Sequence, residues 1–198
     1  MYRRWGKRVF DIVVSLGALI VLLPFLVAIS IWIKLSSKGA VFYEQERVGE
    51  SFKPFMLYKF RSMVVGADKI GPGVTSGDDP RITKIGKVLR RTKIDELPQL
   101  LNVLKGEMSL VGPRPELMKF VETQKEAYKK VLSVKPGITD NASIAYRNEE
   151  EIMKQYENKE RAYIEEILPQ KIKLYNEYIE NISFVRDIKL ILQTLKVL

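Results

Sequence analysis

The stretch IVVSLGALIVLLPFLVAISIWI, residues 12–33, contains no charged residue over 22 positions. As an α-helix at about 1.5 Å per residue it would be roughly 33 Å long, close to the hydrocarbon thickness of a bilayer. A signal peptide has a shorter apolar region that ends at small residues, whereas this run ends in Trp32-Ile33-Lys34. A buried helix of a soluble protein seldom lacks a polar stripe over this length. The stretch therefore predicts a membrane-associated helix.

Basic residues flank this apolar stretch on both sides. Those before it are Arg3, Arg4, Lys7 and Arg8, and those after it are Lys34 and Lys38. Because Lys and Arg favour the cytoplasmic side of a membrane, the flanks predict that both ends lie on that side. Pro24 removes a backbone hydrogen bond near the middle and kinks the helix. We therefore predict a re-entrant helix over residues 1–36, with a kinked transmembrane span as the alternative.

The rest of the chain, residues 37–198, has the length of one domain. It contains neither cysteine nor histidine, which excludes disulfides, thiolate nucleophiles, Cys-ligated metals and the commonest general base. Catalysis would have to use carboxylates, Lys, Arg, Tyr or Ser/Thr. Any metal would be a hard cation bound by oxygen.

The positive charge is unevenly distributed. The net charge is +9, and residues 1–114 hold 19 Lys and Arg against 10 Asp and Glu, while residues 115–198 hold 14 of each kind. The excess in the first part fits nucleic acid, an anionic membrane surface or a phosphorylated substrate as the partner. A merely solubilising surface would mix the two signs more evenly.

The pattern beyond residue 36 predicts a mostly helical α+β domain. Residues 41–46 and 55–60 are rich in β-forming residues on either side of a polar break, which predicts a short β-hairpin. The Gly-, Pro- and Asp-rich residues 66–81 predict a mobile loop. Residues 82–94 predict a basic amphipathic helix that lies either on a membrane surface or on the protein core.

Four further helices are predicted toward the carboxyl end. They cover residues 95–105, 116–133, 149–181 and 183–198, and the third has a break at Pro169. The apolar residues of the last helix recur at helical spacing, which favours packing on the core over binding to a partner.

Two adjacent carboxylates, Asp95 and Glu96, open the helix predicted over residues 95–105. The free N–H groups and the dipole of that helix end would keep both of them ionised. Thr92 and Asp95 fit a capping box, so helix capping is one interpretation. Chemistry is the other, because neighbouring helical residues point about 100° apart and can have separate functions.

Basic residues in short motifs accompany this pair. Arg114 lies between Pro113 and Pro115, which restrict the backbone on both sides and suit a bidentate contact from its guanidinium to phosphate. The other candidate cations are Lys59, Arg61, Arg90 and Arg147. A carboxylate nucleophile among cations, with a divalent ion to screen phosphate charge, favours phosphoryl-group chemistry.

Nearly end to end, the chain resembles the bacterial sugar transferases, which are monotopic polyprenyl-phosphate phosphoglycosyl transferases. The resemblance rests on KRVFDIVVSLGALIVLLPFL (residues 7–26), VFYEQERVG (41–49), KPFMLYKFRSM (53–63), DDPRITKIGKVLRRTKIDELPQLLNVLKGEMSLVGPRP (78–115) and KPGIT (135–139). The match indicates a form with the catalytic core only.

This resemblance implies transfer of a phospho-sugar from a UDP-sugar to a polyprenyl (undecaprenyl) phosphate, with release of UMP, as the first membrane step of surface glycan synthesis. Asp95 and Glu96 match the family's dyad, which implies that Asp95 is the nucleophile of a covalent aspartyl intermediate and that Mg²⁺ lies at Asp95 and the diphosphate. Lys59, Arg90, Arg114 and Arg147 fall on basic positions of the family, and with Arg61 they are the candidate substrate-binding residues.

The resemblance also implies a place in the bacterial inner (cytoplasmic) membrane, with the catalytic domain, residues 37–198, facing the cytoplasm. The expected partners are a UDP-sugar, a polyprenyl phosphate and anionic lipid, and not nucleic acid; formation of a homo-oligomer is left open. A membrane-anchored basic module that binds nucleic acid or anionic lipid without catalysis is the alternative, and a phosphohydrolase with water as acceptor is a third hypothesis.

Three positions depart from the pattern of many relatives. Residues 140–143 read DNAS instead of a Gly-Leu-Ala-Gln run, Tyr175 stands at a commonly acidic position, and Leu23 replaces a Ser before Pro24. These changes leave the dyad intact and concern the nucleotide or sugar site and the bend of the membrane helix.

Overall fold

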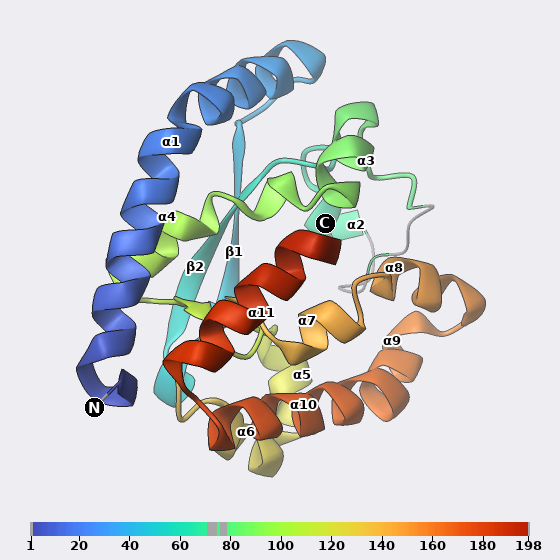
Figure 1. Ribbon diagram of the computed structural model, residues 1–198. Helices are drawn as coiled ribbons and strands as arrows, with labels where there is room; N and C mark the ends of the chain where they lie inside the picture. Colours follow the sequence, from blue (N-terminus) through green and yellow to red (C-terminus); the bar gives the residue numbers. More distant parts are fainter. Residues whose placement is uncertain (1, 71–74, 76–78, 198) are drawn as a thin grey trace.

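The computed structural model describes residues 2–70, 75 and 79–197. It consists of one long amino-terminal helix that runs along a body of short helices and two small two-stranded sheets (Figure 1). The prediction of a mostly helical α+β protein is confirmed at this level.

The long helix, α1, spans Lys7–Ser36 and follows a π-helical turn at Tyr2–Gly6. Most of its apolar side chains are exposed, and in the described part of the chain it alone is long and apolar enough to cross a membrane. Pro24 lies inside it, and the helix bends between a longer first limb and a shorter second one (Figure 1). The bend is expected where proline removes a backbone hydrogen bond.

The start of α1 is bound to the body by charged side chains. Lys7 Nζ donates to Asp187 Oδ2 at 2.6 Å, and Asp187 also accepts a hydrogen bond from the Tyr178 hydroxyl at 2.8 Å. Arg8 Nη2 donates to the backbone oxygen of Leu104 at 2.9 Å. These buried contacts fix the first turns of α1 to the carboxyl-terminal half of the chain.

The end of α1 is bound to the same body by Arg61. Its guanidinium donates to the backbone oxygens of Ser37 at 2.8 Å and Lys38 at 2.9 Å. These carbonyls at the end of a helix lack intrahelical partners, so a buried cation stabilises them. Ile29 and Ile33 pack in one apolar cluster with residues of the body. Both ends of α1 are therefore held by one structural unit.

The predicted hairpin is present. Strands β1, Phe42–Val48, and β2, Pro54–Phe60, pair antiparallel, and a 3₁₀ turn at Glu50–Phe52 connects them. Lys59 is the second-last residue of β2, where it pairs with Tyr43 of β1, and it lines the cavity described below.

A second, parallel pair of strands was not predicted. Strands β3, Ser109–Val111, and β4, Gly137–Thr139, are only three residues long each. A Cβ atom added to Gly137 would lie 2.1 Å from the backbone nitrogen of Gly112, so the close approach of the two segments requires glycine. The pairing places the GPRP and KPGIT motifs side by side.

Two predicted helices have different limits in the structure. Residues 67–70 form a short helix, α2, inside the predicted loop, much of which lies outside the described residues. Helix α3, Lys84–Arg91, buries Ile85 and Leu89 against the body, and this favours core packing over a purely interfacial position. The helix predicted from residue 95 begins later: Ile94–Glu96 is a 3₁₀ turn, and α4 spans Gln99–Lys105.

The remaining helices are α5 at Met118–Thr123, α6 at Lys125–Val131, α7 at Asn141–Ala145, α8 at Glu149–Ile152, α9 at Lys159–Ala162, α10 at Leu168–Glu180 and α11 at Phe184–Val197. The predicted helices over residues 116–133 and 149–181 are each divided into shorter ones, the last helix agrees with the prediction, and α7 was not predicted. The predicted break at Pro169 is wrong: a π-helical turn at Tyr163–Ile167 leads into α10, and Pro169 sits in the first turn of α10, where proline is tolerated. Helix α11 lies in front of the body beside α7 (Figure 1).

Candidate active site

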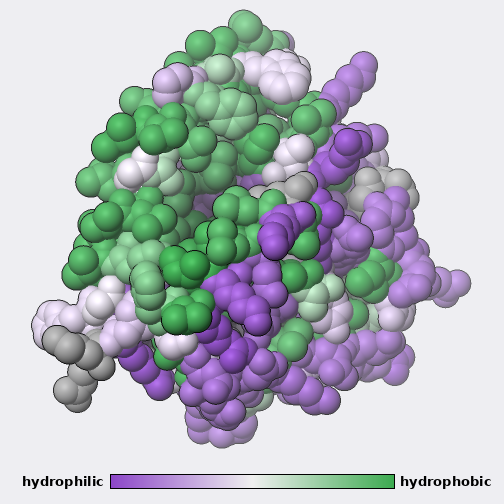
Figure 2. All heavy atoms as spheres, viewed as in Figure 1, coloured by the Kyte–Doolittle hydropathy of each residue, from purple (hydrophilic) through white to green (hydrophobic). Residues whose placement is uncertain are grey.

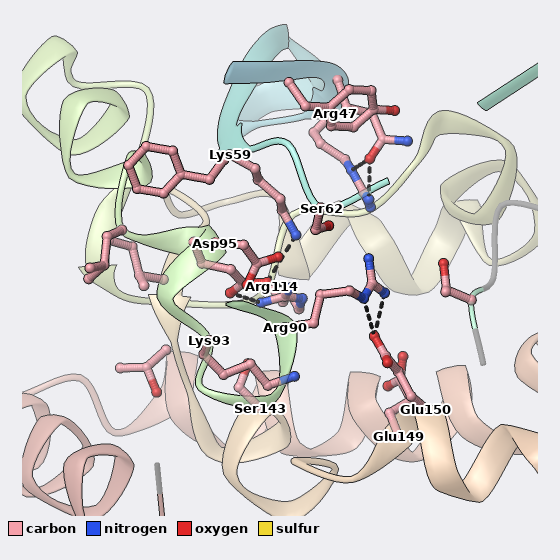
Figure 3. A pocket seen from close by; sticks show the side chains of 18 of the residues that line it. Arg47, Lys59, Ser62, Arg90, Lys93, Asp95, Arg114, Ser143, Glu149 and Glu150 are labelled. Atoms are coloured by element: carbon pink, nitrogen blue, oxygen red, sulfur yellow. Dashed lines mark hydrogen bonds and ion pairs between the residues drawn. The ribbon is translucent and has the colours of Figure 1, made fainter. Parts of the chain in front are cut away.

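A cavity of about 890 Å³ opens between the hairpin, α3, α7, α8 and α11. Its polar part is lined by Lys59, Arg90, Lys93, Asp95, Glu96, Arg114, Arg147, Glu149 and Glu150. All seven sequence-predicted site residues thus line one cavity, although they come from separate segments of the chain. Figure 3 shows Lys59, Arg90, Asp95 and Arg114 there.

Asp95 lies in the 3₁₀ turn before α4 and is 4% exposed. The capping interpretation is wrong, because neither the turn nor α4 has a side-chain cap, and Thr92 instead donates its hydroxyl to the carbonyl of Val88 at 2.9 Å. Asp95 Oδ1 is buried without a hydrogen-bond partner among the described residues. A buried carboxylate oxygen left unpaired is costly for stability and is typical of a functional group.

The pKa of Asp95 is raised from 3.8 to about 6, chiefly by burial and secondly by the negative charge of Glu96. The cations Lys59, Arg90 and Lys93 oppose this shift. The predicted cause of ionisation, a helix amino terminus at Asp95, is wrong, because the α-helix begins only at Gln99. Asp95 with a pKa of about 6 is still mostly ionised at neutral pH.

Glu96 is held by two cations. Lys59 Nζ lies 2.9 Å from Glu96 Oε1, and Arg114 Nη1 lies 3.0 Å from Oε2, with a second short contact from Arg114 Nη2 to Oε1. Burial alone would raise the pKa of Glu96, but the charges and hydrogen bonds of Arg114 and Lys59 outweigh it and keep this pKa well below the ordinary value. The Glu96 charge in turn raises the pKa of Arg114. Adjacent carboxylates thus differ sharply in proton affinity.

Arg114 contacts Glu96 through both terminal nitrogens, so its bidentate partner in this structure is a carboxylate. The loop that carries it is fixed by β3 and β4, since Gly137 N donates to Pro113 O at 2.9 Å. The bidentate contact to phosphate stays a prediction. The structure gives Arg114 a definite second function, which is to neutralise and orient Glu96.

Arg90 and Arg147 line the same cavity. Arg90 Nε donates to Glu150 Oε1 at 3.0 Å, and a second short contact from Arg90 Nη2 joins the same oxygen (Figure 3). This ion pair connects α3 to α8 across the cavity. Arg147 follows α7 and lines the wall.

Arg61 also lines the cavity, but its guanidinium is turned to the end of α1 and is 6% exposed. All four of its contacts within hydrogen-bond distance are to α1 or the residues just after it. The structure therefore does not bring the Arg61 charge to the dyad.

A second buried charge cluster, missed from the sequence, lies deeper in the cavity. Lys171 is 2% exposed and donates to Glu149 Oε2 at 2.8 Å and to the Tyr163 hydroxyl at 3.0 Å. Glu116 lies 3.6 Å from the same ammonium group. The signal available in the sequence was the position of Lys171 on the apolar face of α10, one residue before the buried Ile172.

The departures from the family pattern have local explanations. Asp140 is buried and caps α7, because its side chain accepts a hydrogen bond from Ser143 N at 3.0 Å. Tyr175 is fully buried in the core, and its hydroxyl has no hydrogen-bond partner among the described residues. Tyr175 therefore fills space without supplying the charge that an acidic residue would bring.

The cavity offers few carboxylate oxygens as ligands for a hard cation. The described residues contain no cluster of three acidic side chains suited to a metal, and Glu96 is already occupied by Lys59 and Arg114. Asp95 Oδ1 is a buried carboxylate oxygen that has no hydrogen-bond partner among the described residues. This set fits Mg²⁺, which is usually bound by one or two carboxylates together with substrate phosphates and waters.

Comparison with known proteins identifies the family. The family described as bacterial sugar transferase matches residues 2–198. A putative undecaprenyl-phosphate N-acetylgalactosaminyl 1-phosphate transferase of Bacillus subtilis is 53% identical over 116 residues, which cover 59% of this chain and 65% of the relative. The UDP-glucose:undecaprenyl-phosphate glucose-1-phosphate transferase of Escherichia coli is 40% identical over 193 residues, 95% of this chain and 39% of the relative.

The chain thus spans less than two thirds of the length of these two relatives. An uncharacterised sugar transferase of Bacillus subtilis, EpsL, is 38% identical over 96% of this chain and 85% of its own length. The whole chain matches the family, and the dyad and its cations lie within the match. This protein belongs to the bacterial sugar transferase family.

Proposed function

We propose that this protein is an enzyme that transfers a sugar 1-phosphate from a UDP-sugar to undecaprenyl phosphate and releases UMP, as the first step of exopolysaccharide or capsule synthesis. The observation that carries the proposal is Asp95: a buried, unpaired carboxylate in a cavity of cations beside a long apolar helix. The names of the relatives supply the donor and acceptor classes.

In the first step, Asp95 Oδ1 attacks the β-phosphorus of the UDP-sugar. An oxygen–phosphorus bond forms to Asp95, and the bond from that phosphorus to the bridging oxygen breaks, so UMP leaves with the electron pair. Arg90, Lys93 and Arg147 line the cavity around Asp95 and can neutralise the charge on the leaving phosphate. A nucleophile with a pKa near 6 is ionised at neutral pH and still leaves readily in the next step.

In the second step, a phosphate oxygen of the lipid attacks the phosphorus bound to Asp95. The new bond makes the diphosphate of the lipid-linked sugar, and the Asp95 carboxylate is released. Neither step needs a separate general base, because both nucleophiles are already anions. This agrees with a chain that has no histidine.

Glu96 is a positioning residue in this mechanism. Its pairs with Lys59 and Arg114 fix two cations at the cavity wall and keep a permanent negative charge beside Asp95. That charge contributes to the raised pKa of Asp95, so Glu96 tunes the nucleophile without replacing it.

Mg²⁺ would be held by the Asp95 carboxylate and by oxygens of the diphosphate. When bound, it would neutralise the charge that develops on the departing UMP.

We also propose that α1 is re-entrant and that the catalytic body faces the cytoplasm of the bacterial inner membrane. The support is that Asp187 and Arg61 hold opposite ends of α1 to one body. A spanning helix would place its ends on opposite sides of the bilayer, where one body could not bind both. The basic residues Arg3, Lys34 and Lys38 near these ends suit an anionic lipid surface.

The function is tested by UMP release from a panel of UDP-sugars by the full chain in lipid nanodiscs, with and without undecaprenyl phosphate. Continuous UMP release that needs both one UDP-sugar and the lipid is the expected result. Continuous release without lipid would indicate a phosphohydrolase, and no release from any UDP-sugar would contradict the proposal. Omission of Mg²⁺ is expected to reduce the rate strongly.

A further inference from the structure

The cavity that contains Asp95 has a cationic part and an apolar part. The apolar part is lined by residues from α1, β3, β4, α7 and α11: Val14, Leu110, Ile138, Ile144, Ile191, Leu195 and Val197. The two parts belong to one continuous space of about 890 Å³. Such a space matches an amphipathic molecule, with its charge at one end and hydrocarbon at the other.

Helix α11 forms one wall of the apolar part and is firmly placed. Its first turn contacts the start of α1, where the rings of Phe184 and Phe10 meet edge to face at 5.5 Å. Its last turns are fixed by a hydrogen bond between the hydroxyls of Thr194 and Thr139. Between these points α11 runs away from α1 (Figure 1). The side of the cavity that is lined by Val14 of α1 and by Ile191, Leu195 and Val197 of α11 is called here the groove between the two helices.

The outer side of α11 is apolar and exposed. The predicted packing of this helix on the core is confirmed for its inner side, where Leu190 is buried in a core cluster. Phe184, Val185, Leu192 and Leu195 are instead between 49% and 74% exposed. Figure 2 shows that the apolar surface of α1 continues onto α11. An apolar surface that extends from a membrane helix is expected to contact lipid as well.

We propose that the groove between α1 and α11 admits the hydrocarbon chain of a lipid phosphate from the bilayer and guides its phosphate to the cations around Asp95. The proposal rests on the proposed function only in taking the acceptor to be a lipid phosphate. It assigns the occupant of the groove by continuity: the same cavity is lined by Leu195, which is 64% exposed on the apolar side of α11, and by Lys59, Arg90 and Asp95.

The test is photolabelling with a polyprenyl phosphate that carries a diazirine on the isoprene units nearest the phosphate. The full chain in nanodiscs is irradiated, digested with trypsin and analysed by mass spectrometry. Residues 190–196, LILQTLK, lie between two lysine cleavage sites and contain the groove side of α11. We expect this peptide to be labelled, and we expect unlabelled undecaprenyl phosphate to compete while inorganic phosphate does not.

A matched pair of variants sharpens the test. Leu195 lines the groove and is 64% exposed, so Leu195→Trp is tolerated by the fold and narrows the groove. Gln193 is exposed on the same turn and does not line the cavity. Labelling of the peptide should fall at least tenfold in Leu195→Trp and stay within about twofold of the parent in Gln193→Trp.

Equal labelling of the two variants, or labelling of the parent only outside α1 and α11, would overturn the proposal. Equal labelling by a diazirine polyprenol without the phosphate would also overturn it, because it would show partition of hydrocarbon alone. Labelling does not require turnover. A protein that is labelled as expected but releases no UMP from any UDP-sugar would therefore contradict the proposed function and still support the lipid site in the groove.

Discussion

At the scale of single residues, Asp95 and Glu96 show how burial and charge separate two neighbouring carboxylates. Burial and the Glu96 charge raise the pKa of Asp95 to about 6, whereas Arg114 and Lys59 hold the pKa of Glu96 well below its usual range. The sequence indicated which residues matter but predicted one environment for both. It could not show that Arg114, distant in the chain, neutralises only Glu96.

The raised pKa predicts the pH dependence of the first chemical step. Because only ionised Asp95 attacks phosphorus, single-turnover UMP release should fall about tenfold per pH unit below pH 6 and level off above about pH 7. Rapid-quench measurements from pH 4.5 to 8, without lipid acceptor, would record the profile. A rate that stays constant down to pH 5 would contradict the assignment of Asp95 as the group that must be ionised.

The same pKa predicts a stability effect of Asp95→Asn. The folded protein holds this proton up to about pH 6 and the unfolded chain only to about 3.8, so the free energy of unfolding falls as pH rises between these values. Above pH 6 the penalty is constant at about 2–3 kcal/mol. Asp95→Asn should therefore stabilise the protein by on the order of 1–3 kcal/mol at pH 7.5, with little gain near pH 4. Denaturation in mild detergent at both pH values would check it, and the same gain at both would argue against it.

At the scale of elements, local patterns predicted the hairpin and most helices, and nonlocal contacts decided the rest. The strands β1 and β2 follow each other and their residues favour β structure, so their pairing was predictable. The strands β3 and β4 are three residues long and separated by α5 and α6, so no local pattern indicates their pairing. Pro98, which precedes α4, and the 3₁₀ turn at Ile94–Glu96 moved the helix start away from Asp95.

The β3–β4 contact predicts a large effect of Gly137→Ala. The new Cβ would meet Gly112 N at 2.1 Å, so the loop with Arg114 must move away from Glu96. We expect a Tm lower by roughly 5–10 °C, from a strain of about 1–3 kcal/mol, and a loss of most activity. Gly17→Ala is the control, since nothing lies within 4 Å of its added Cβ. Equal Tm values for Gly137→Ala and Gly17→Ala would show that Gly137 and Gly112 are not packed as closely as in this structure.

At the scale of the whole molecule, the cavity joins segments that are far apart in the sequence. The sequence predicted that Lys59, Arg90, Arg114 and Arg147 accompany the dyad, and the structure places all four at one cavity. It could not predict that Arg61 would instead bind the end of α1, because that contact depends on where the helix returns to the body. The cluster around Lys171 was missed because its partners come from three different helices and loops.

The attachment of both ends of α1 to one body predicts the membrane topology. The chain contains no cysteine, so each of the single substitutions Arg3→Cys and Lys38→Cys introduces one thiol, and any maleimide labelling must occur at that position. Both should react with a membrane-impermeant maleimide in inverted membrane vesicles and neither in intact spheroplasts. Lys129→Cys, on an exposed side chain of the body, is the positive control for the cytoplasmic side. Labelling of the two ends from opposite sides would replace the re-entrant helix by a spanning one.

The central claim, that Asp95 is the covalent nucleophile, is tested most directly by intact and peptide mass spectrometry of the protein incubated with its UDP-sugar and Mg²⁺ and without lipid. Because Asp95 is buried and unpaired while Glu96 is bound by two cations, the phospho-sugar adduct should form on Asp95 alone. The adduct should be absent in Asp95→Asn, persist in Gln193→Trp, and disappear from the parent when undecaprenyl phosphate is added. An adduct on another residue, or near-normal turnover by Asp95→Asn, would contradict the account.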